Sequence, residues 1–174
     1  MRYAQITPFE VCNGKGAGVS LFVQGCHFQC KGCFNQESWD FCGGKEWNEE
    51  IENKFFELVE KPYIKRVTIL GGEPFANENV IDVYDLIVKI KDRFPNKSIW
   101  LYTGFNFGDI INCPLRDIYT TYRRKVISTC DVVIDGRFIE ELKDLTLEFR
   151  GSSNQRIIDV KDSVKNNKIV LYNN

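Results

Sequence analysis

The chain has 174 residues, of which 43% are hydrophobic and 27% are charged, and its formal net charge is −1 at pH 7. This length and apolar content suit a single globular domain and exclude a disordered chain. The balanced charge excludes the strongly basic surface typical of nucleic-acid-binding proteins, and no apolar run approaches the roughly 18 residues that a membrane-spanning helix needs.

Four short apolar runs are typical of strands, and segments with helical spacing of hydrophobic residues separate them. The predicted strands cover 18–25, 65–72, 97–104 and 131–136. The predicted helices cover 47–61, 79–94 and part of 114–127. This alternation predicts an α/β fold whose parallel strands are joined by right-handed crossovers. We expect one domain over residues 1–160, followed by a C-terminal tail over 161–174.

Three of the predicted strands end in glycine, at Gly71–Gly72, Gly104 and Gly136. Ligands of parallel α/β proteins bind beyond the carboxyl ends of the strands, so we expect the functional site at this edge. The chain is too short for a closed eight-stranded barrel of about 250 residues. An open, partial (β/α) barrel or a curved doubly wound sheet is therefore expected.

Three of the seven cysteines, Cys26, Cys30 and Cys33, follow the first predicted strand with the spacing C-x3-C-x2-C. The amino-terminal segment lacks the apolar core of a signal peptide, so we expect a cytoplasmic protein with reduced thiols. Clustered thiolates bind zinc, copper(I) or iron–sulfur clusters. A structural zinc site needs four ligands, and the fourth would have to be His27 or a distant cysteine such as Cys42. Spacing alone therefore favours an iron–sulfur cluster with one open iron, with zinc or unligated thiols as the alternatives.

The cysteine spacing resembles the signature of the radical S-adenosylmethionine superfamily, and "GGEP" at 71–74 resembles its motif for holding the amine of adenosylmethionine. Glycines let the backbone approach a ligand closely, and Glu73 would complement the charge of an ammonium group. Taken alone, "GGEP" also suits a turn after a strand. Further segments, above all "DGRF" at 135–138 and "RGSSNQR" at 150–156, resemble the anaerobic ribonucleoside-triphosphate reductase activating proteins. The resemblance covers about residues 6–160.

This resemblance implies one [4Fe–4S] cluster per chain, held by Cys26, Cys30 and Cys33, and an open iron that chelates S-adenosylmethionine. It implies a partial barrel of the radical S-adenosylmethionine type, with no catalytic side chain beyond the cluster and the cofactor. Reductive cleavage of the cofactor would generate a radical that takes hydrogen from a glycine of the reductase's large subunit, leaving a glycyl radical. A reduced flavodoxin-like protein is implied as the electron donor. The cofactor contacts are expected at Gly32, Cys33, Phe34, Gly71, Gly72 and Glu73.

Two positions depart from the pattern of these relatives. Gly18 stands where the family usually carries an arginine, which puts the role of that arginine in doubt. Many radical enzymes have an aromatic residue before the third cysteine, whereas Gly32 precedes Cys33 here. Packing on the adenine would therefore fall to Phe34 or to the backbone beside it.

Several residues near the predicted site have two interpretations. Asp135 either lines an entrance for the partner's glycine loop or is a turn residue before Gly136. Arg150 and Asn154 either contact the partner or the cofactor, or belong to a capped turn that ties the C-terminal segment to the sheet. The remaining cysteines lack ligand spacing and are expected to be buried or idle thiols. They are Cys12, Cys42, Cys113 and Cys130.

Two other functions compete with the activation of a reductase. One is a small-molecule enzyme of the 7-carboxy-7-deazaguanine synthase type, against which "RGSSNQR" argues. The other is a non-catalytic zinc-binding interaction module, which leaves the strand-end "GGEP" unexplained.

Overall fold

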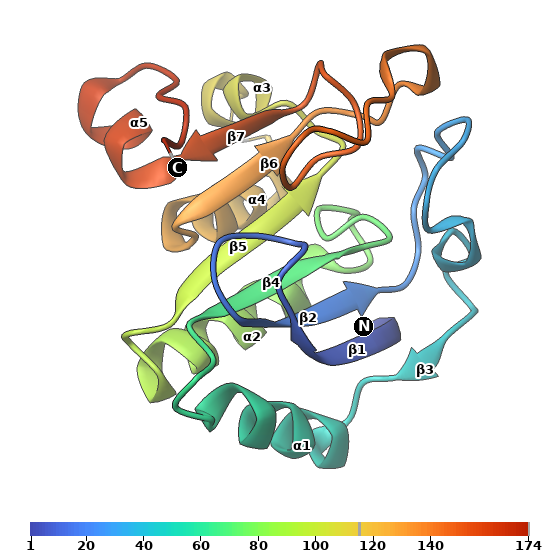
Figure 1. The fold of residues 1–174 in the computed structure, drawn as a ribbon, viewed down its shortest axis with the longest axis vertical. Helices are drawn as coiled ribbons and strands as arrows, with labels where there is room; N and C mark the ends of the chain where they lie inside the picture. The colour runs from blue at the N-terminus through green and yellow to red at the C-terminus, as the bar shows by residue number, and fades with distance from the viewer. Residues whose placement is uncertain (115, 174) are drawn as a thin grey trace.

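The computed structural model describes residues 1–114 and 116–173 and contains an open β-sheet with helices against one face (Figure 1). Position 115 of the helix predicted within 114–127 and position 174 of the predicted tail lie outside the described residues. Over the described residues, the sheet has seven strands in the order β3-β1-β2-β4-β5-β6-β7. Their bounds are Arg2–Glu10 (β1), Gly18–Val23 (β2), Lys45–Glu46 (β3), Arg66–Gly71 (β4), Ser98–Thr103 (β5), Val132–Asp135 (β6) and Arg156–Asp159 (β7).

The four predicted strands are confirmed as β2, β4, β5 and β6, and they pair in parallel at the centre of the sheet. The flanking strands β1, β3 and β7 pair antiparallel with their neighbours, and the sequence analysis missed all three. The strand predicted at 18–25 is therefore the second in the chain and ends at Val23. An α/β fold with a parallel centre is confirmed, and antiparallel strands form both edges.

The helices predicted at 47–61 and 79–94 are confirmed, and the helix predicted within 114–127 begins at Ile118 and continues to Thr129. Side-chain caps fix three of the helix starts, where Asn48 accepts from the backbone N–H of Ile51, Asp117 from that of Thr120 and Asp159 from that of Asp162. Two short helices were not predicted. The helix bounds are Glu49–Glu60 (α1), Val80–Arg93 (α2), Phe107–Asn112 (α3), Ile118–Thr129 (α4) and Val160–Asn166 (α5). No helix in the described part of the chain is long and apolar enough to cross a membrane.

The two faces of the parallel strands carry different residues, because side chains alternate along a strand. The face toward the helices is apolar except near the carboxyl ends of β5 and β6, where Thr103 and Asp135 lie, and it forms the main core with α1, α2 and α4. The opposite face carries polar and aromatic residues in the central strands, and the loop of residues 11–17 crosses in front of it in Figure 1. These residues of β4 and β5 are Arg66, Thr68, Trp100 and Tyr102, and the aliphatic Leu70 lies on the same face.

A buried ion pair fastens the 11–17 loop to this second face of the sheet. Arg66 is fully buried, and its Nη1 lies 2.6 Å from Oε1 of Glu10, at the end of β1. Its Nη2 donates to the carbonyl of Gly16 over 3.0 Å. A Cβ at Gly18 would lie 2.6 Å from Cζ of this guanidinium, so only glycine fits beneath Arg66. The glycine at position 18 is therefore explained by an arginine that arrives from the neighbouring strand.

The last described residues of the chain return to β7, and Tyr172 packs on the same side of the sheet as Trp100. Ile158 forms an antiparallel bridge with Leu171, and the backbone N–H of Tyr172 donates to the carbonyl of Ile157 over 2.9 Å. The ring of Tyr172 meets that of Trp100 edge-on at 5.2 Å. Part of the segment expected to be a tail is thus helix α5 and a short extended stretch on the sheet.

Candidate functional site

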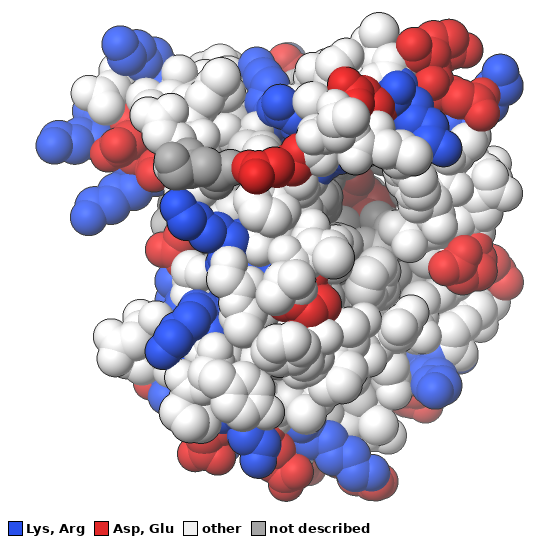
Figure 2. Space-filling view, viewed as in Figure 1, with Lys and Arg blue, Asp and Glu red and all other residues white. Residues whose placement is uncertain are grey.

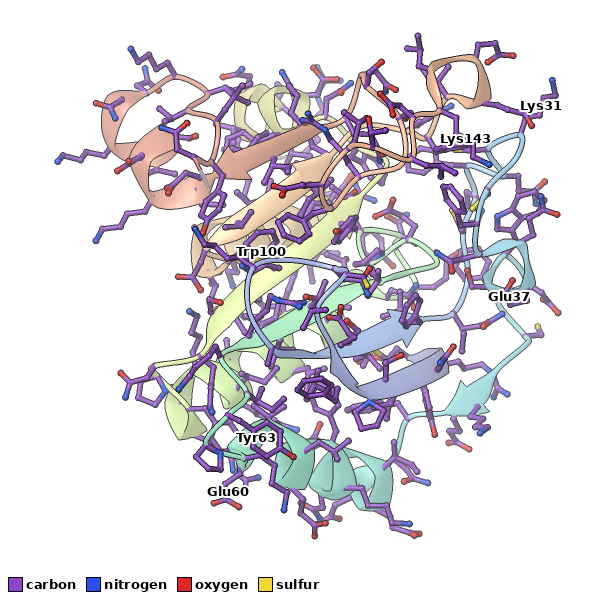
Figure 3. All side chains as sticks on the ribbon, in the orientation of Figure 1. Lys31, Glu37, Glu60, Tyr63, Trp100 and Lys143 are labelled. Atoms are coloured by element: carbon purple, nitrogen blue, oxygen red, sulfur yellow. The ribbon has the colours of Figure 1, made fainter. Side chains whose placement is uncertain are left out.

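A cavity of about 480 Å³ opens at the carboxyl ends of the parallel strands. Its walls come from the cysteine loop (residues 24–35), the ends of β4 and β5, and the β6–β7 connection (residues 136–155). Figure 2 shows this face of the molecule hollowed below the β6–β7 connection. Figure 3 labels Lys31 and Lys143 where the two loops approach each other, and Lys31 pairs with Glu140 over 2.9 Å. The cavity lies at the edge where the strand-end glycines predict a ligand site.

The start of the cysteine loop is held by backbone hydrogen bonds that it donates to the segment following the loop. The N–H of Gly25 donates to the carbonyl of Ser38 over 2.7 Å, and that of Cys26 to Trp39 over 3.0 Å. The N–H of Cys33 turns back to the carbonyl of Cys30 over 3.1 Å. All three predicted ligand cysteines line the cavity. The loop therefore presents three thiols to one enclosed space.

The thiols lie in an environment that disfavours a free thiolate but supplies donors to a bound one. Burial raises the pKa of Cys26, and the N–H groups of Phe28 and Gln29 partly oppose that shift. Burial and the neighbouring Cys33 raise the pKa of Cys30, and a hydrogen bond from the backbone N–H of Phe138 partly opposes that shift. A positively charged metal group would offset the cost of ionising these sulfurs, and N–H donors to sulfur are typical of iron–sulfur sites.

Neither of the two residues that could complete a zinc site lies at the cavity with the three thiols. Among the described residues, no three His, Cys, Asp or Glu side chains lie close enough together to hold one metal ion. Cysteines that each bind a different iron need not converge on one point, whereas the ligands of a zinc ion must. His27 lies outside the cavity lining, and its Nε2 is 3.0 Å from Oε1 of Glu78. Cys42 is exposed and also lies outside the lining.

The "GGEP" segment is hydrogen-bonded directly to the start of the cysteine loop. The N–H of Gly72 donates to the carbonyl of Val23 over 2.8 Å, and the N–H of Glu73 to that of Gly25 over 2.7 Å. Gly71 has a φ of +102°, which favours glycine, and a Cβ at Gly72 would lie 2.5 Å from the carbonyl oxygen of Gly25. The two glycines therefore allow the end of β4 to lie against the cysteine loop.

Glu73 lines the cavity but is only 3% exposed. Its Oε1 accepts from the Thr103 hydroxyl and from the N–H of Phe75, and its Oε2 accepts from the N–H of Gly104, each over 2.8 Å. Burial raises the pKa of Glu73 to about 7, although these hydrogen bonds partly oppose the shift. Glu73 thus joins the ends of β4 and β5, and it carries the only carboxylate among the described cavity-lining residues.

Other predicted site residues divide into those at the cavity and those elsewhere. Phe34 lines the cavity, is 56% exposed and meets the ring of Phe138 at 5.2 Å. Gly32 lies outside the lining, and a Cβ there would be 2.7 Å from the Glu140 carboxylate. The cysteine loop therefore brings Phe34 and the three thiols to the cavity, while Gly32 faces the β6–β7 connection.

Asp135 ties strands together and does not lie at the cavity entrance. It is 1% exposed, its carboxylate pairs with the Arg156 guanidinium, and Oδ2 accepts from the N–H of Phe107 over 2.8 Å. It lies outside the cavity lining. Of its two interpretations, a structural role at the end of β6 agrees with these contacts.

The "RGSSNQR" segment forms a capped turn that also borders the cavity. Oε1 of Gln155 accepts from the N–H of Gly151 over 2.9 Å, and its Nε2 donates to the carbonyl of Gly136 over 3.1 Å. Nδ2 of Asn154 donates to the carbonyl of Arg137 over 2.9 Å. Arg150, Gly151 and Gln155 line the cavity, whereas Asn154 does not.

Sequence reasoning missed many residues of the cavity wall, and three of them carry polar or thiol groups that could reach a ligand. Arg137 lies with its Cζ 4.2 Å from the centre of the Phe28 ring, and only its position in the "DGRF" segment hinted at a role. Cys12 and Asn13 arrive from the loop that crosses the sheet face, and sequence reasoning assigned neither of them to the site.

The chain is similar to one domain family and to several curated proteins. Residues 12–158 match the family model described as a 4Fe-4S single cluster domain. The anaerobic ribonucleoside-triphosphate reductase-activating protein of Vibrio cholerae serotype O1 is 36% identical over 159 residues, which are 90% of this chain and 97% of that protein. The protein of that name from Escherichia coli K12 is 32% identical, over 89% of this chain and 96% of its own length. The one from Enterobacteria phage T4 is 34% identical, over 94% and 97%.

Proposed function

Because the chain belongs to the family of anaerobic ribonucleoside-triphosphate reductase-activating proteins, we propose that it activates such a reductase by forming a glycyl radical on the large subunit. The reaction we propose is the reductive cleavage of S-adenosylmethionine at a [4Fe–4S] cluster. The match to a 4Fe-4S single cluster domain supports an iron–sulfur protein. The open sheet would then correspond to the partial barrel expected of radical S-adenosylmethionine enzymes, in a single domain located in the cytoplasm.

One observation carries the proposal: the three thiols and the "GGEP" segment line the same cavity and are joined by the hydrogen bond from Glu73 to Gly25. Cys26, Cys30 and Cys33 would hold three irons and leave one open for the cofactor. When bound, the reduced cluster supplies the electron that cleaves adenosylmethionine to methionine and a 5′-deoxyadenosyl radical.

The protein's own groups would bind and orient the cofactor. The backbone at Gly71 and Gly72, next to the buried carboxylate of Glu73, suits an ammonium group, because strand-end carbonyls accept hydrogen bonds and Glu73 adds negative charge. Phe34 offers an aromatic surface for the adenine. The lining phenylalanines and leucines would exclude water from a radical that must react with one chosen partner.

The mouth of the cavity remains accessible, as a macromolecular substrate requires. A glycine-bearing loop of the reductase would enter between the cysteine loop and the β6–β7 connection. A reduced flavodoxin-like protein would supply the electron from outside.

The test is anaerobic reconstitution of the full chain, followed by measurement of iron, sulfide and zinc. Dithionite and S-adenosylmethionine are then added, and 5′-deoxyadenosine is quantified. We expect about four irons per chain and release of 5′-deoxyadenosine. Addition of the reductase large subunit should produce a glycyl-radical signal in electron paramagnetic resonance.

The other functions predict different results in the same experiment. A zinc-binding module gives a colourless protein with one zinc and no cleavage, which would overturn the proposal. An enzyme with a small-molecule substrate cleaves adenosylmethionine but gives no glycyl radical on the reductase, which would overturn the assigned partner.

A further inference from the structure

We propose that Arg150 binds the carboxylate of S-adenosylmethionine, an inference that rests on the proposed function. The "RGSSNQR" segment distinguishes this sequence, yet the proposed reaction assigns no task to its first residue. Arg150 lines the cavity that the three cysteines and Glu73 share. Four features of its surroundings point to an anionic ligand.

The first feature is the unused hydrogen-bonding capacity of the guanidinium. Nη1 of Arg150 donates to the carbonyl of Gln155 over a long 3.3 Å. Its Nε is buried and has no hydrogen-bond partner. No carboxylate among the described residues forms an ion pair with Arg150. A buried N–H without an acceptor is costly, so a ligand oxygen at this position would be bound strongly.

The second feature is the backbone that presents Arg150. The preceding residue, Phe149, has a φ of +55°, a left-handed conformation that is rare for an aromatic residue. Two contacts enforce it, since the Tyr102 hydroxyl donates to the Phe149 carbonyl over 2.6 Å and the Phe149 ring meets Trp100 edge-on at 5.5 Å. Such strained residues persist where the surrounding structure holds them and are common at ligand sites.

The third feature is the distribution of charge in the cavity. The described lining residues include one carboxylate, Glu73, and two guanidinium groups, Arg137 and Arg150. The methionyl part of the cofactor is a zwitterion with an ammonium and a carboxylate. Its ammonium suits the Glu73 side of the cavity, and its carboxylate suits a guanidinium.

The fourth feature distinguishes the two arginines. Arg137 is exposed, and its guanidinium lies over the Phe28 ring at 4.2 Å, which already offsets part of its charge. Arg150 is only partly exposed, and within the described part of the chain no aromatic ring lies beneath its guanidinium. A carboxylate has two oxygens, so it can meet both an iron and the Arg150 guanidinium.

The experiment measures equilibrium binding of two ligands to the reconstituted, non-reduced protein. One ligand is S-adenosylmethionine, and the other is its carboxamide, which keeps an oxygen but lacks the negative charge. The variants are Arg150→Gln, Arg150→Lys and the control Arg93→Gln, which removes a guanidinium stacked at 4.3 Å on Phe56, away from the cavity lining. Iron content and circular dichroism establish that each variant is loaded and folded.

We expect Arg150→Gln to weaken binding of adenosylmethionine about 10- to 100-fold, because a charge-assisted hydrogen bond is lost. Binding of the carboxamide should weaken much less, Arg150→Lys should recover part of the loss, and Arg93→Gln should bind both ligands as the parent protein does. Equal weakening of both ligands by Arg150→Gln, or no weakening, would overturn the assignment. If the parent protein binds neither ligand, the proposed function itself fails. If the parent protein binds S-adenosylmethionine but Arg150→Gln does not weaken that binding selectively, only the assignment of Arg150 fails.

Discussion

Two buried glutamates at opposite ends of the same parallel strands have opposite electrostatic properties. At the amino ends, Glu10 faces the fully buried guanidinium of Arg66. Burial alone would raise the pKa of Glu10, but hydrogen bonds from Arg66, Ser20 and the backbone of Asn13 outweigh it and hold that pKa below 4.5. At the carboxyl ends, Glu73 accepts only from neutral donors, and burial raises its pKa to about 7.

The two ends of the sheet therefore differ in how their charged side chains are used. At the amino ends the charges pair with each other and stabilise a loop, whereas at the carboxyl ends they line a cavity. At the amino end, Glu10 and Arg66 pair with each other, and their other hydrogen bonds go to β2, to β4 and to the loop that they fasten, which leaves only Nε of Arg66 without an acceptor. The carboxyl end keeps Glu73 and Arg150 in one cavity without an ion pair between them. A carboxylate and a guanidinium that share a cavity without pairing can both bind a ligand that has a positive and a negative group.

The largest expected effect is at the carboxyl end, in the variant Cys30→Ala. Loss of this thiol should prevent stable cluster assembly and abolish release of 5′-deoxyadenosine, while the fold stays intact. Iron content, product release and circular dichroism measure the three quantities. The matched control is Cys42→Ala, which removes an exposed thiol outside the cavity lining and should leave iron content unchanged. Full iron loading of Cys30→Ala would contradict the assignment of this ligand.

The next largest effect is at the amino end, where Glu10→Gln keeps the shape of the side chain but removes its charge. Arg66 would remain buried without a counter-charge, so we expect the free energy of unfolding to fall by about 3–5 kcal/mol. Urea denaturation measures it. The control Glu50→Gln breaks the exposed pair with Lys54 and should change stability little. An equally small change in Glu10→Gln would show that the ion pair does not stabilise the loop.

The pH dependence of stability should sharpen the contrast between the two glutamates. The folded-state pKa of Glu73, about 7, lies above its ordinary value of 4.5, so the folded chain holds this proton more tightly than the unfolded chain. Its contribution to stability is complete below pH 4.5 and is lost as pH rises through 7, by roughly 3 kcal/mol in total.

Glu73→Gln has no titrating group at this position and should lack that part of the pH dependence. Urea denaturation of the cluster-free chain across this pH window, for the parent and the variant, measures the difference. Parallel pH profiles for the two proteins would mean that Glu73 ionises in the folded chain as it does in water.

The smallest expected effect is that of Gly18→Ala. The added methyl group would lie 2.6 Å from Cζ of Arg66, whose bonds to Glu10 and Gly16 prevent it from moving away. Overpacking of this kind costs about 1–3 kcal/mol of unfolding free energy, measured by urea denaturation. In the control Gly108→Ala, the nearest atom to the new methyl group is 4.0 Å away, so stability should be kept or improved. If Gly18→Ala left the free energy of unfolding unchanged, the Arg66 guanidinium would be free to shift.

The sequence by itself determined the parallel centre of the sheet and the edge that carries the site. Hydrophobic periodicity identified β2, β4, β5 and β6 and helices α1, α2 and α4, because each pattern is local to one element. The cysteine spacing indicated an iron–sulfur cluster, because cysteines a few positions apart lie on one loop, and the family resemblance of the "GGEP" segment implied S-adenosylmethionine.

Hydrophobic periodicity did not reveal the edge strands β1, β3 and β7. Strand β3 is only Lys45–Glu46, which is too short for a pattern to stand out, and β7, Arg156–Asp159, has only two apolar residues between two charged ones. Strand β1 is interrupted by irregular pairing with β2, which disturbs its alternation. These strands exist because a neighbour pairs with them, and pairing is a long-range property.

Only the tertiary structure decided which charges meet. Arg66 pairs with Glu10 across 56 positions of sequence, and Glu73 bonds to Thr103 across 30. The loop that carries Cys12 reaches the cavity because it crosses the face of the sheet, and Gly18 is glycine because an arginine from the next strand lies above it. Burial and pairing at such distances depend on the completed packing of the chain, so no local pattern of residues predicts them.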